Sequence, residues 1–187
     1  MTIEKHFKHH SETPSDINEH LPKLREYAKK SKHITEMGVR TVVSTWAFLA
    51  GKPKKLVCYD LGRHPSVDEA ELLAIDAKIE FEFHEKSVLE VEIEETDFLF
   101  IDTFHTATQL EKELALHAGK VRKYIGFHDT HTFWEKGEPP YETTGGKGLD
   151  CGRGLKYALE PFMAAHPEWQ LEYTTSANNG LTIIKRV

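Results

Sequence analysis

The chain has 187 residues and a formal net charge of −6, which suits one globular domain with a full-sized core. Lysines and glutamates are mixed along its length, so the sequence predicts no basic face and disfavours a nucleic-acid partner. No apolar stretch reaches the length of a membrane span, and the two cysteines, Cys58 and Cys151, form no CxxC pair; these features predict a cytoplasmic protein without a membrane partner.

Residues 1–32 are expected to form an N-terminal helical extension. Apolar residues recur at helical spacing over 21–28 and predict an amphipathic helix there. The histidine-rich start, with His6, His9 and His10, is expected to be a solvated and partly frayed terminus.

From residue 33 onward, apolar runs of strand length alternate with segments of helical pattern. The strand patterns cover residues 33–37, 56–60, 79–83, 97–102, 123–128, 169–174 and 181–185. The helical patterns cover residues 43–50, 67–73, 108–117 and 155–164. The turn sequence Asn178-Asn179-Gly180 between the last two strands is typical of an antiparallel hairpin. The sequence therefore predicts one three-layer α/β domain over 1–187, with a mostly parallel seven-stranded sheet and a C-terminal antiparallel hairpin.

Residues 132–153 are rich in glycine, proline and charge and show no periodicity. Segments of this length inside a domain are often functional. Trp134 and Tyr141, together with several glycines, make the segment a candidate lid over an aromatic or sugar-like ligand. A plain surface loop is the alternative that the sequence leaves open.

Two of the predicted strands end in an acid beside histidine. One ends at Asp102 and is followed by His105, and the other ends at His128 and is followed by Asp129. Because the carboxyl ends of parallel strands meet at one edge of a sheet, we expect these four side chains in one polar pocket that could hold a divalent cation. In the alternative reading, the two acids only cap the next helix or turn.

A second pair of residues predicts a cofactor site at the same edge. Gly38 follows the first predicted strand, and Asp60 ends the second about twenty residues later. A glycine there lets a ligand approach the backbone, and an acid there can accept hydrogen bonds from ribose hydroxyls. The spacing suits NAD and S-adenosylmethionine alike, but GxGxxG is absent. An ordinary turn at Gly38 and an exposed strand end at Asp60 remain alternatives.

Three segments carry a more specific pattern, namely 35–45 (TEMGVRTVVST), 97–106 (DFLFIDTFHT) and 124–130 (YIGFHDT). They resemble, in order and spacing, the motifs of class I S-adenosylmethionine-dependent methyltransferases. The similarity is to the branch that holds methyltransferase family 24, the cephalosporin-hydroxylase-like proteins and the catechol-type O-methyltransferases. This resemblance implies a Rossmann-like methyltransferase fold and O-methylation of a small-molecule acceptor.

The resemblance also implies roles for individual residues. The implied cofactor-binding residues are Glu36, Gly38, Ser44, Asp60, Glu85, Ser87 and Asp102. The implied catalytic residues are Asp102, His105 and His128, with His105 in the position of a lysine base. The implied ligands of a divalent cation, Mg²⁺ or Mn²⁺, are Asp102, His128 and Asp129.

One departure from the family pattern concerns Val42, which replaces the second glycine of the first motif. We expect its branched side chain to lie where the backbone should approach the methionine moiety of the cofactor. Val42 therefore keeps a non-catalytic S-adenosylmethionine-binding module as an alternative. A nicotinamide-dependent Rossmann oxidoreductase is a further alternative, disfavoured by the missing GxGxxG and Tyr-x-x-x-Lys patterns. A homodimer is also left open.

Overall fold

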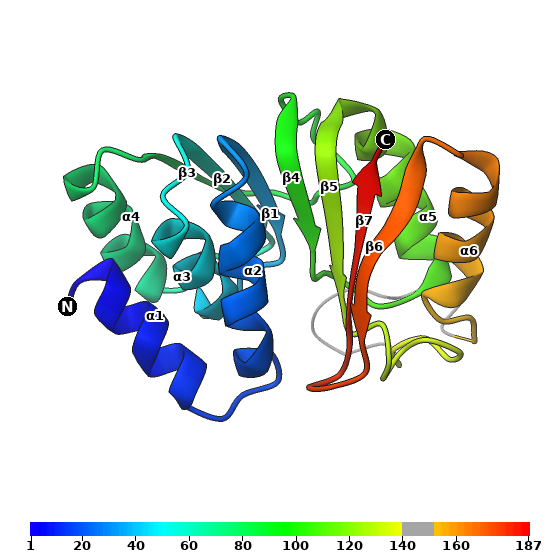
Figure 1. Ribbon diagram of the computed structural model, residues 1–187, viewed down its shortest axis with the longest axis horizontal. Helices are drawn as coiled ribbons and strands as arrows, with labels where there is room; N and C mark the ends of the chain where they lie inside the picture. Colours follow the sequence, from blue (N-terminus) through cyan, green and yellow to red (C-terminus); the bar gives the residue numbers. More distant parts are fainter. Residues whose placement is uncertain (140–151) are drawn as a thin grey trace.

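A seven-stranded sheet with helices on both of its faces forms the centre of the molecule (Figure 1). The structure is a computed structural model that describes residues 1–139 and 152–187. The strands are β1 (His33–Met37), β2 (Lys55–Asp60), β3 (Glu80–Glu85), β4 (Thr96–Ile101), β5 (Val121–His128), β6 (Trp169–Thr175) and β7 (Leu181–Arg186). The helices are α1 (Ile3–Glu12), α2 (Leu21–Ala28), α3 (Val43–Ala50), α4 (Ser66–Asp76), α5 (Ala107–His117) and α6 (Lys156–Ala165), with short 3₁₀ turns η1 (Asn18–His20) and η2 (Ala118–Lys120).

The strands lie in the order β3-β2-β1-β4-β5-β7-β6. Strand β7 pairs antiparallel with both β5 and β6, whereas the pairings among β1 to β5 are parallel. The predicted mostly parallel sheet with a C-terminal antiparallel hairpin is therefore confirmed. Strand β3 lies at one edge of the sheet.

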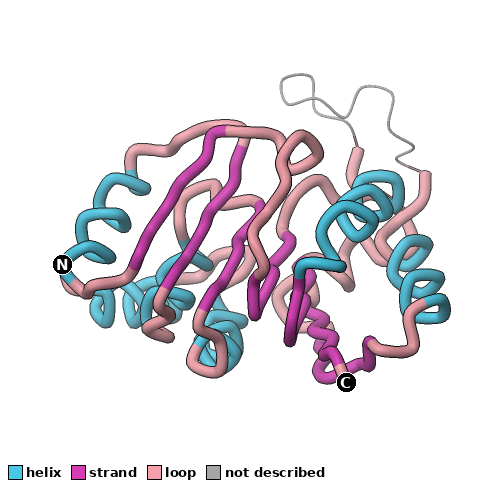
Figure 2. Tube along the Cα trace, turned by 90° about the horizontal axis from the view of Figure 1, so that it is seen from above, coloured by secondary structure: helices cyan, strands magenta, loops and turns pink. Residues whose placement is uncertain are grey.

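Helices lie on both faces of the sheet (Figure 2). Two clusters of buried apolar side chains hold them there. Strand residues alternate between these clusters: Ile34 belongs to the cluster under α1 to α4, and Met37 belongs to the cluster under α5 and α6. Both faces of the central strands are covered, which explains why β1 and β4 are buried along their whole length. No helix in the described part of the chain is long and apolar enough to cross a membrane.

The N-terminal segment is ordered, so the expectation of a frayed terminus was wrong. Thr2 caps helix α1 by accepting a hydrogen bond from the Lys5 N–H. His6 is buried and stacks on Trp46 of α3, with 4.0 Å between the ring centroids and 8° between the ring planes. Its Nε2 lies 2.9 Å from a Glu69 oxygen. A histidine at a core-facing position gave no hydrophobic signal in the sequence, although its ring packs like an aromatic residue.

Candidate functional site

The polar residues that follow the central strands meet at one edge of the sheet, as expected. A cavity of about 700 Å³ runs along this edge. Its walls include Gly38, Asp60, Asp102, His105 and Asp129, so the predicted cofactor features and the predicted reactive groups share one space. This location, outside the carboxyl ends of parallel strands, is where open α/β sheets bind ligands.

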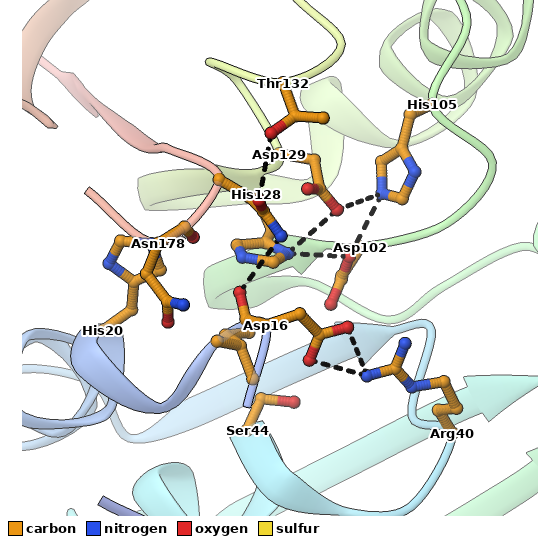
Figure 3. Close-up of polar contacts among 12 residues, drawn as sticks. Asp16, His20, Arg40, Ser44, Asp102, His105, His128, Asp129, Thr132 and Asn178 are labelled. Carbon is orange, nitrogen blue, oxygen red and sulfur yellow. Dashed lines mark hydrogen bonds and ion pairs between the residues drawn. The ribbon is translucent and has the colours of Figure 1, made fainter. Parts of the chain in front are cut away.

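Two acids and two histidines form a closed ring of contacts at this edge of the sheet (Figure 3), and all but His128 line the cavity. Asp102 Oδ1 lies 3.2 Å from both His105 Nε2 and His128 Nδ1. Asp129 Oδ2 lies 3.0 Å from the same His105 nitrogen and 3.1 Å from the same His128 nitrogen. Each histidine therefore bridges both carboxylates, and the predicted convergence of these four residues is present.

The acids do not act as helix caps, which was the alternative reading. Helix α5, the first after Asp102, is capped by Thr106, whose hydroxyl accepts from the Gln109 N–H. Asp129 adopts a left-handed backbone conformation with φ of 59°. Such conformations in non-glycine residues cost free energy and concentrate at functional sites.

The ring of opposite charges changes the protonation of its members. Burial alone would lower the pKa of His105, but hydrogen bonds to Asp102 and Glu138 and the nearby carboxylate charges raise it to about 10. Burial would likewise lower the pKa of His128, yet the charge and hydrogen bond of Asp102, followed by Asp129, raise it to about 10. Burial would raise the pKa of Asp102, but the two histidines hold it well below its usual range. The raised pKa values of His105 and His128 favour imidazolium rings on either side of the Asp102 carboxylate.

Glu138 is a fifth member of the cluster, and sequence reasoning missed it. Its Oε2 lies 2.8 Å from His105 Nδ1 and accepts from the His105 backbone N–H at 3.2 Å. The Glu138 N–H in turn donates to the His105 carbonyl oxygen at 2.9 Å. Phe133 stacks on the same ring, 5.0 Å away with 6° between the planes. These contacts fix the plane of His105 and leave its Nε2 facing the two aspartates.

His20, from the N-terminal segment, was also missed. Its ring packs edge-on against His128 at 5.5 Å, and its Nε2 lies 2.9 Å from the Asn178 carbonyl oxygen (Figure 3). Burial and the charge of His128 lower the pKa of His20, so it is neutral at pH 7 and donates from Nε2 to Asn178. The ring of His128 is therefore packed by a segment near the start of the chain that is itself bonded to a turn near its end, which no local sequence pattern signals.

The cluster has the donor atoms and spacing of a divalent cation site. Adjacent ligand atoms of an octahedral ion with bonds of about 2.1 Å lie about 3.0 Å apart, close to the 3.0–3.2 Å contacts around the ring. Asp102, His128 and Asp129 offer ligand atoms that all lie within 4.8 Å of one another. Carboxylate oxygens suit Mg²⁺ and Mn²⁺, and an imidazole ligand favours Mn²⁺ over Mg²⁺. These residues fit a cation.

The cofactor side of the cavity is organised by Asp60. Its Oδ2 accepts from the backbone N–H groups of Val39 and Arg40 at 2.7 and 2.8 Å. Its Oδ1 has one longer contact, 3.3 Å from the Gly62 N–H. Asp60 therefore stabilises the loop after β1 with one oxygen and presents the other to the cavity.

Two of the predicted cofactor-binding residues, Glu36 and Ser44, bond to each other and stabilise the fold. Glu36 is fully buried and does not belong to the cavity wall. Its carboxylate accepts from Ser44 at 2.5 Å, Thr45 at 2.7 Å and Cys58 at 3.3 Å, while burial raises its pKa to about 7. Ser44 lies in the cavity wall, but its hydroxyl donates to Glu36. Glu36 and Ser44 thus hold helix α3 against β1.

Of the two predicted cofactor-binding residues that end or follow β3, one lines the cavity and the other does not. Ser87 lies in the cavity wall, whereas Glu85 lies outside it and accepts from the Arg63 N–H at 3.2 Å. Cofactor binding by Glu85 and Ser87 remains a prediction.

Val42 does not lie where the sequence suggested. Its side chain is 1% exposed and packs in the core cluster, and it is not part of the cavity wall. Its backbone has φ of 63°, the left-handed conformation that a glycine adopts easily and a β-branched residue rarely does. Val42 therefore has the backbone conformation that is typical of glycine, and its side chain packs in the core and not in the cavity wall.

The candidate lid falls largely outside the described residues. Tyr141, the glycines near it and Cys151 lie outside them. Within the described part, Trp134 is partly buried and packs against the core cluster under α5 and α6.

Comparison with known proteins agrees with this architecture. The sequence matches no family model, and no curated protein is similar to it in sequence. Its structure is similar to the O-methyltransferase from Bacillus cereus solved with SAH (S-adenosylhomocysteine), with a TM-score of 0.63, 16% identity, and coverage of 99% of this chain and 90% of that one. It is similar to TomG from Streptomyces achromogenes, an O-methyltransferase solved with SAM (S-adenosylmethionine), with a TM-score of 0.61, 13% identity, and coverage of 99% and 89%. It is also similar to a SAH-bound methyltransferase from Podospora anserina, with a TM-score of 0.59, 16% identity, and coverage of 99% of this chain and 87% of that one. The chain thus has the fold of the S-adenosylmethionine-dependent O-methyltransferases.

Proposed function

We propose that this protein is an S-adenosylmethionine-dependent O-methyltransferase that acts on a small molecule with the assistance of a divalent cation. The observation that carries the proposal is the shared cavity, which places Gly38 and Asp60 in one wall and the Asp102–His105–Asp129 contacts in another. At about 700 Å³ it has the size of a small-molecule site. The fold supports the same conclusion, since the similar structures are O-methyltransferases.

S-adenosylmethionine, when bound, supplies an electrophilic methyl group. Asp60 would accept a hydrogen bond from a ribose hydroxyl through Oδ1, because its Oδ2 already accepts from two backbone N–H groups. Asp102 lines the same cavity, and we expect its carboxylate to face the acceptor. The remaining requirement is to align the acceptor oxygen and remove its proton.

A divalent cation, when bound, lowers the pKa of an acceptor hydroxyl and fixes its position. Asp102, His128 and Asp129 would hold it. His105 faces both carboxylates and lines the cavity, so it is the group placed to take the acceptor proton. Because the pKa of His105 is raised to about 10 in the ion cluster, it accepts that proton only once the charge of its carboxylate partners is neutralised.

The first test is calorimetric titration with S-adenosylhomocysteine and, separately, with NAD⁺. Binding of the former alone supports the proposal, and binding of NAD⁺ alone would replace it with the oxidoreductase. A screen with labelled methyl donor and catechol-like or sugar-like acceptors follows, with and without a chelator. Cofactor binding without transfer to any acceptor, and without any effect of metal, would favour the non-catalytic binding module.

We also infer a small-molecule acceptor rather than a nucleic acid or a membrane lipid, and a cytoplasmic setting. The net charge of −6, with lysines and glutamates mixed along the chain, supports this choice of acceptor because polyanionic partners would be repelled. Replacement of the small acceptors by RNA, DNA or vesicles in the labelling assay tests it. Sedimentation of the purified protein addresses the homodimer that the sequence leaves open.

A further inference from the structure

The large cavity presents more negative than positive charge to a ligand. The acids that line it in the described residues are Asp16, Asp60, Asp102, Asp129 and Glu138. His105 is already in contact with three of these acids. The lysine and arginine side chains of the described wall are Lys86 and Arg40. A ligand that carries a carboxylate is therefore repelled along most of this wall and attracted near these two cations.

The backbone of Arg40 is fixed beside the acid that we assign to the ribose. Its N–H donates to Asp60 Oδ2 at 2.8 Å, and its φ of 47° is a left-handed conformation. Partial burial would lower the pKa of Arg40, but its bond to Asp16, followed by the charges of Asp102 and Asp129, raises it. Arg40 therefore stays positively charged, close to the proposed cofactor residues and within electrostatic reach of the ion cluster.

A carboxylate of the protein already binds this guanidinium. Both oxygens of Asp16 accept from Arg40 Nη2, at 2.7 and 2.6 Å (Figure 3). Arg40 Nε and Nη1 make no hydrogen bond to the described residues. The side chains of Arg40 and Asp16 are 69% and 38% exposed, and ion pairs at such exposure are weak because water screens them. A ligand carboxylate can therefore bind the open edge of the guanidinium or replace Asp16.

The segment that carries Asp16 is positioned by the last turn of the chain. The Ser15 carbonyl oxygen accepts from Asn178 Nδ2 at 2.8 Å, and the Asp16 carbonyl oxygen accepts from Asn179 Nδ2 at 3.4 Å. Ile17, the next residue, is buried and lines the cavity. These contacts hold the segment at the cavity without the help of Arg40, so a change at the Asp16 carboxylate leaves its backbone anchored.

We propose that Arg40 binds the carboxylate of a ligand in this cavity and that Asp16 takes its place when no ligand is bound. The inference rests on the proposed function, and the group belongs either to the methionyl part of the cofactor or to an acidic acceptor. Arg40 then attracts the ligand, because a guanidinium suits a carboxylate, whereas Asp16 competes with it. An ion pair that only stabilised the fold would show no such opposition, since the loss of either partner breaks the same contact.

Calorimetric titration with S-adenosylhomocysteine and with 5′-methylthioadenosine tests the cofactor as the source. The two compounds share the adenosine part, but only the first has a carboxylate. We expect Arg40→Met to weaken the binding of S-adenosylhomocysteine about tenfold and Asp16→Asn to strengthen it about two- to fivefold. Neither substitution should change the binding of 5′-methylthioadenosine. The matched control is Arg63→Met, which removes an ion-paired arginine outside the cavity and should change neither affinity.

The acceptor is tested in the same variants with saturating S-adenosylhomocysteine and Mn²⁺. Titration with 3,4-dihydroxybenzoate and with catechol compares an acidic probe with a neutral one. Weaker binding of the acid alone in Arg40→Met, with stronger binding in Asp16→Asn, would assign the carboxylate to the acceptor and support the proposal. Should Arg40→Met fail to fold, the gain in Asp16→Asn decides the matter by itself.

The proposal is overturned if neither carboxylate-bearing probe responds, if Arg40→Met and Asp16→Asn weaken binding alike, or if Lys86→Met causes the loss in place of Arg40→Met. Wild-type protein that binds neither adenosine compound would overturn the proposed function, and this inference with it. Wild-type protein that binds S-adenosylhomocysteine with an affinity that ignores both substitutions, in the absence of an acceptor response, overturns the inference alone.

Discussion

The carbonyl oxygen of Asp102 occupies the space that a side chain at Gly38 would need. A Cβ built on Gly38 would overlap that oxygen, and the glycine has φ of +85°. The backbone of β4 can therefore pass close to the end of β1, where the Asp102 N–H donates to the Met37 carbonyl at 2.8 Å. The sequence suggested that Gly38 lets a ligand approach the backbone. The structure shows that the close passage of Asp102, at the end of the neighbouring strand β4, already requires a glycine there.

Gly38→Ala should accordingly lower the free energy of unfolding by about 2–4 kcal/mol, from the positive φ and the overlap with backbone. Urea denaturation measures this change. Gly119→Ala is the matched control, because a Cβ there meets nothing within 4 Å. Equal stabilities of the two variants would mean that the close approach of Asp102 is not a constraint.

Asp60→Asn should weaken the binding of S-adenosylhomocysteine by about 1–3 kcal/mol, because a charge-assisted bond to the ribose is lost. The amide keeps an oxygen for the Val39 and Arg40 N–H groups, so the loop is disturbed less than by alanine. Calorimetry measures the affinity. Asp68→Asn, in the first turn of α4, is the control and should bind as the wild type does. The same affinity in both variants would remove Asp60 from the cofactor site.

Asp129→Asn should weaken the binding of Mn²⁺ at least about tenfold, since one of the charged ligands is lost. Titration of metal-free protein, followed by electron paramagnetic resonance, measures the affinity. Glu92→Gln changes an exposed acid outside the site and should have no effect. Removal of metal with a chelator should abolish methyl transfer and leave the affinity for S-adenosylhomocysteine nearly unchanged. If the wild-type protein does not bind Mn²⁺, the cluster is an ion-pair network without a cation.

Glu36→Gln should flatten the pH dependence of stability between about pH 4.5 and pH 7. Burial raises the pKa of Glu36 from 4.5 to about 7, so the folded state holds a proton that the unfolded state releases in this range. The contribution of Glu36 to stability therefore falls as the pH rises through the range and levels off above it. The difference between these two pKa values corresponds to a loss on the order of 3 kcal/mol. Urea denaturation at several pH values measures it, and parallel curves for the two proteins would contradict the assignment.

Val42→Ala should leave the affinity for S-adenosylhomocysteine unchanged within about twofold, because the side chain lies in the core and not in the cavity wall. Stability should fall by about 1–2 kcal/mol, because buried methyl groups are lost while the left-handed conformation remains. Calorimetry and urea denaturation separate the two effects. A large gain in affinity would restore the expectation that Val42 obstructs the cofactor.

The sequence predicted the sheet and the ring of four residues because both follow from local patterns. Apolar runs marked β4 and β5, and parallel strands place their carboxyl ends at one edge. Asp102 and His128 could therefore be brought together from the order of residues alone. The strand alternation also held the information that Glu36 points away from the edge, since it shares a face with the buried Ile34.

The remaining members of the site left no such signal. Glu138 lies within the segment 132–153, which has no periodicity, and His20 lies in a single 3₁₀ turn far from the motifs. Contacts of this kind depend on the tertiary packing of distant segments, which a hydrophobic pattern does not encode.

The position of β7 between β5 and β6 has a consequence for the order in which the protein can assemble. β7 is the last strand in the sequence, and until it is added, β5 exposes the row of backbone groups that later pairs with residues 181–185. An unpaired edge next to an apolar strand is a template for wrong pairing between chains. The turn that precedes β7 also carries Asn178, the partner of His20. Ribosome-bound chains that end before β7 should therefore lack the finished pocket and be prone to aggregation, even though every residue of the ring has already been made.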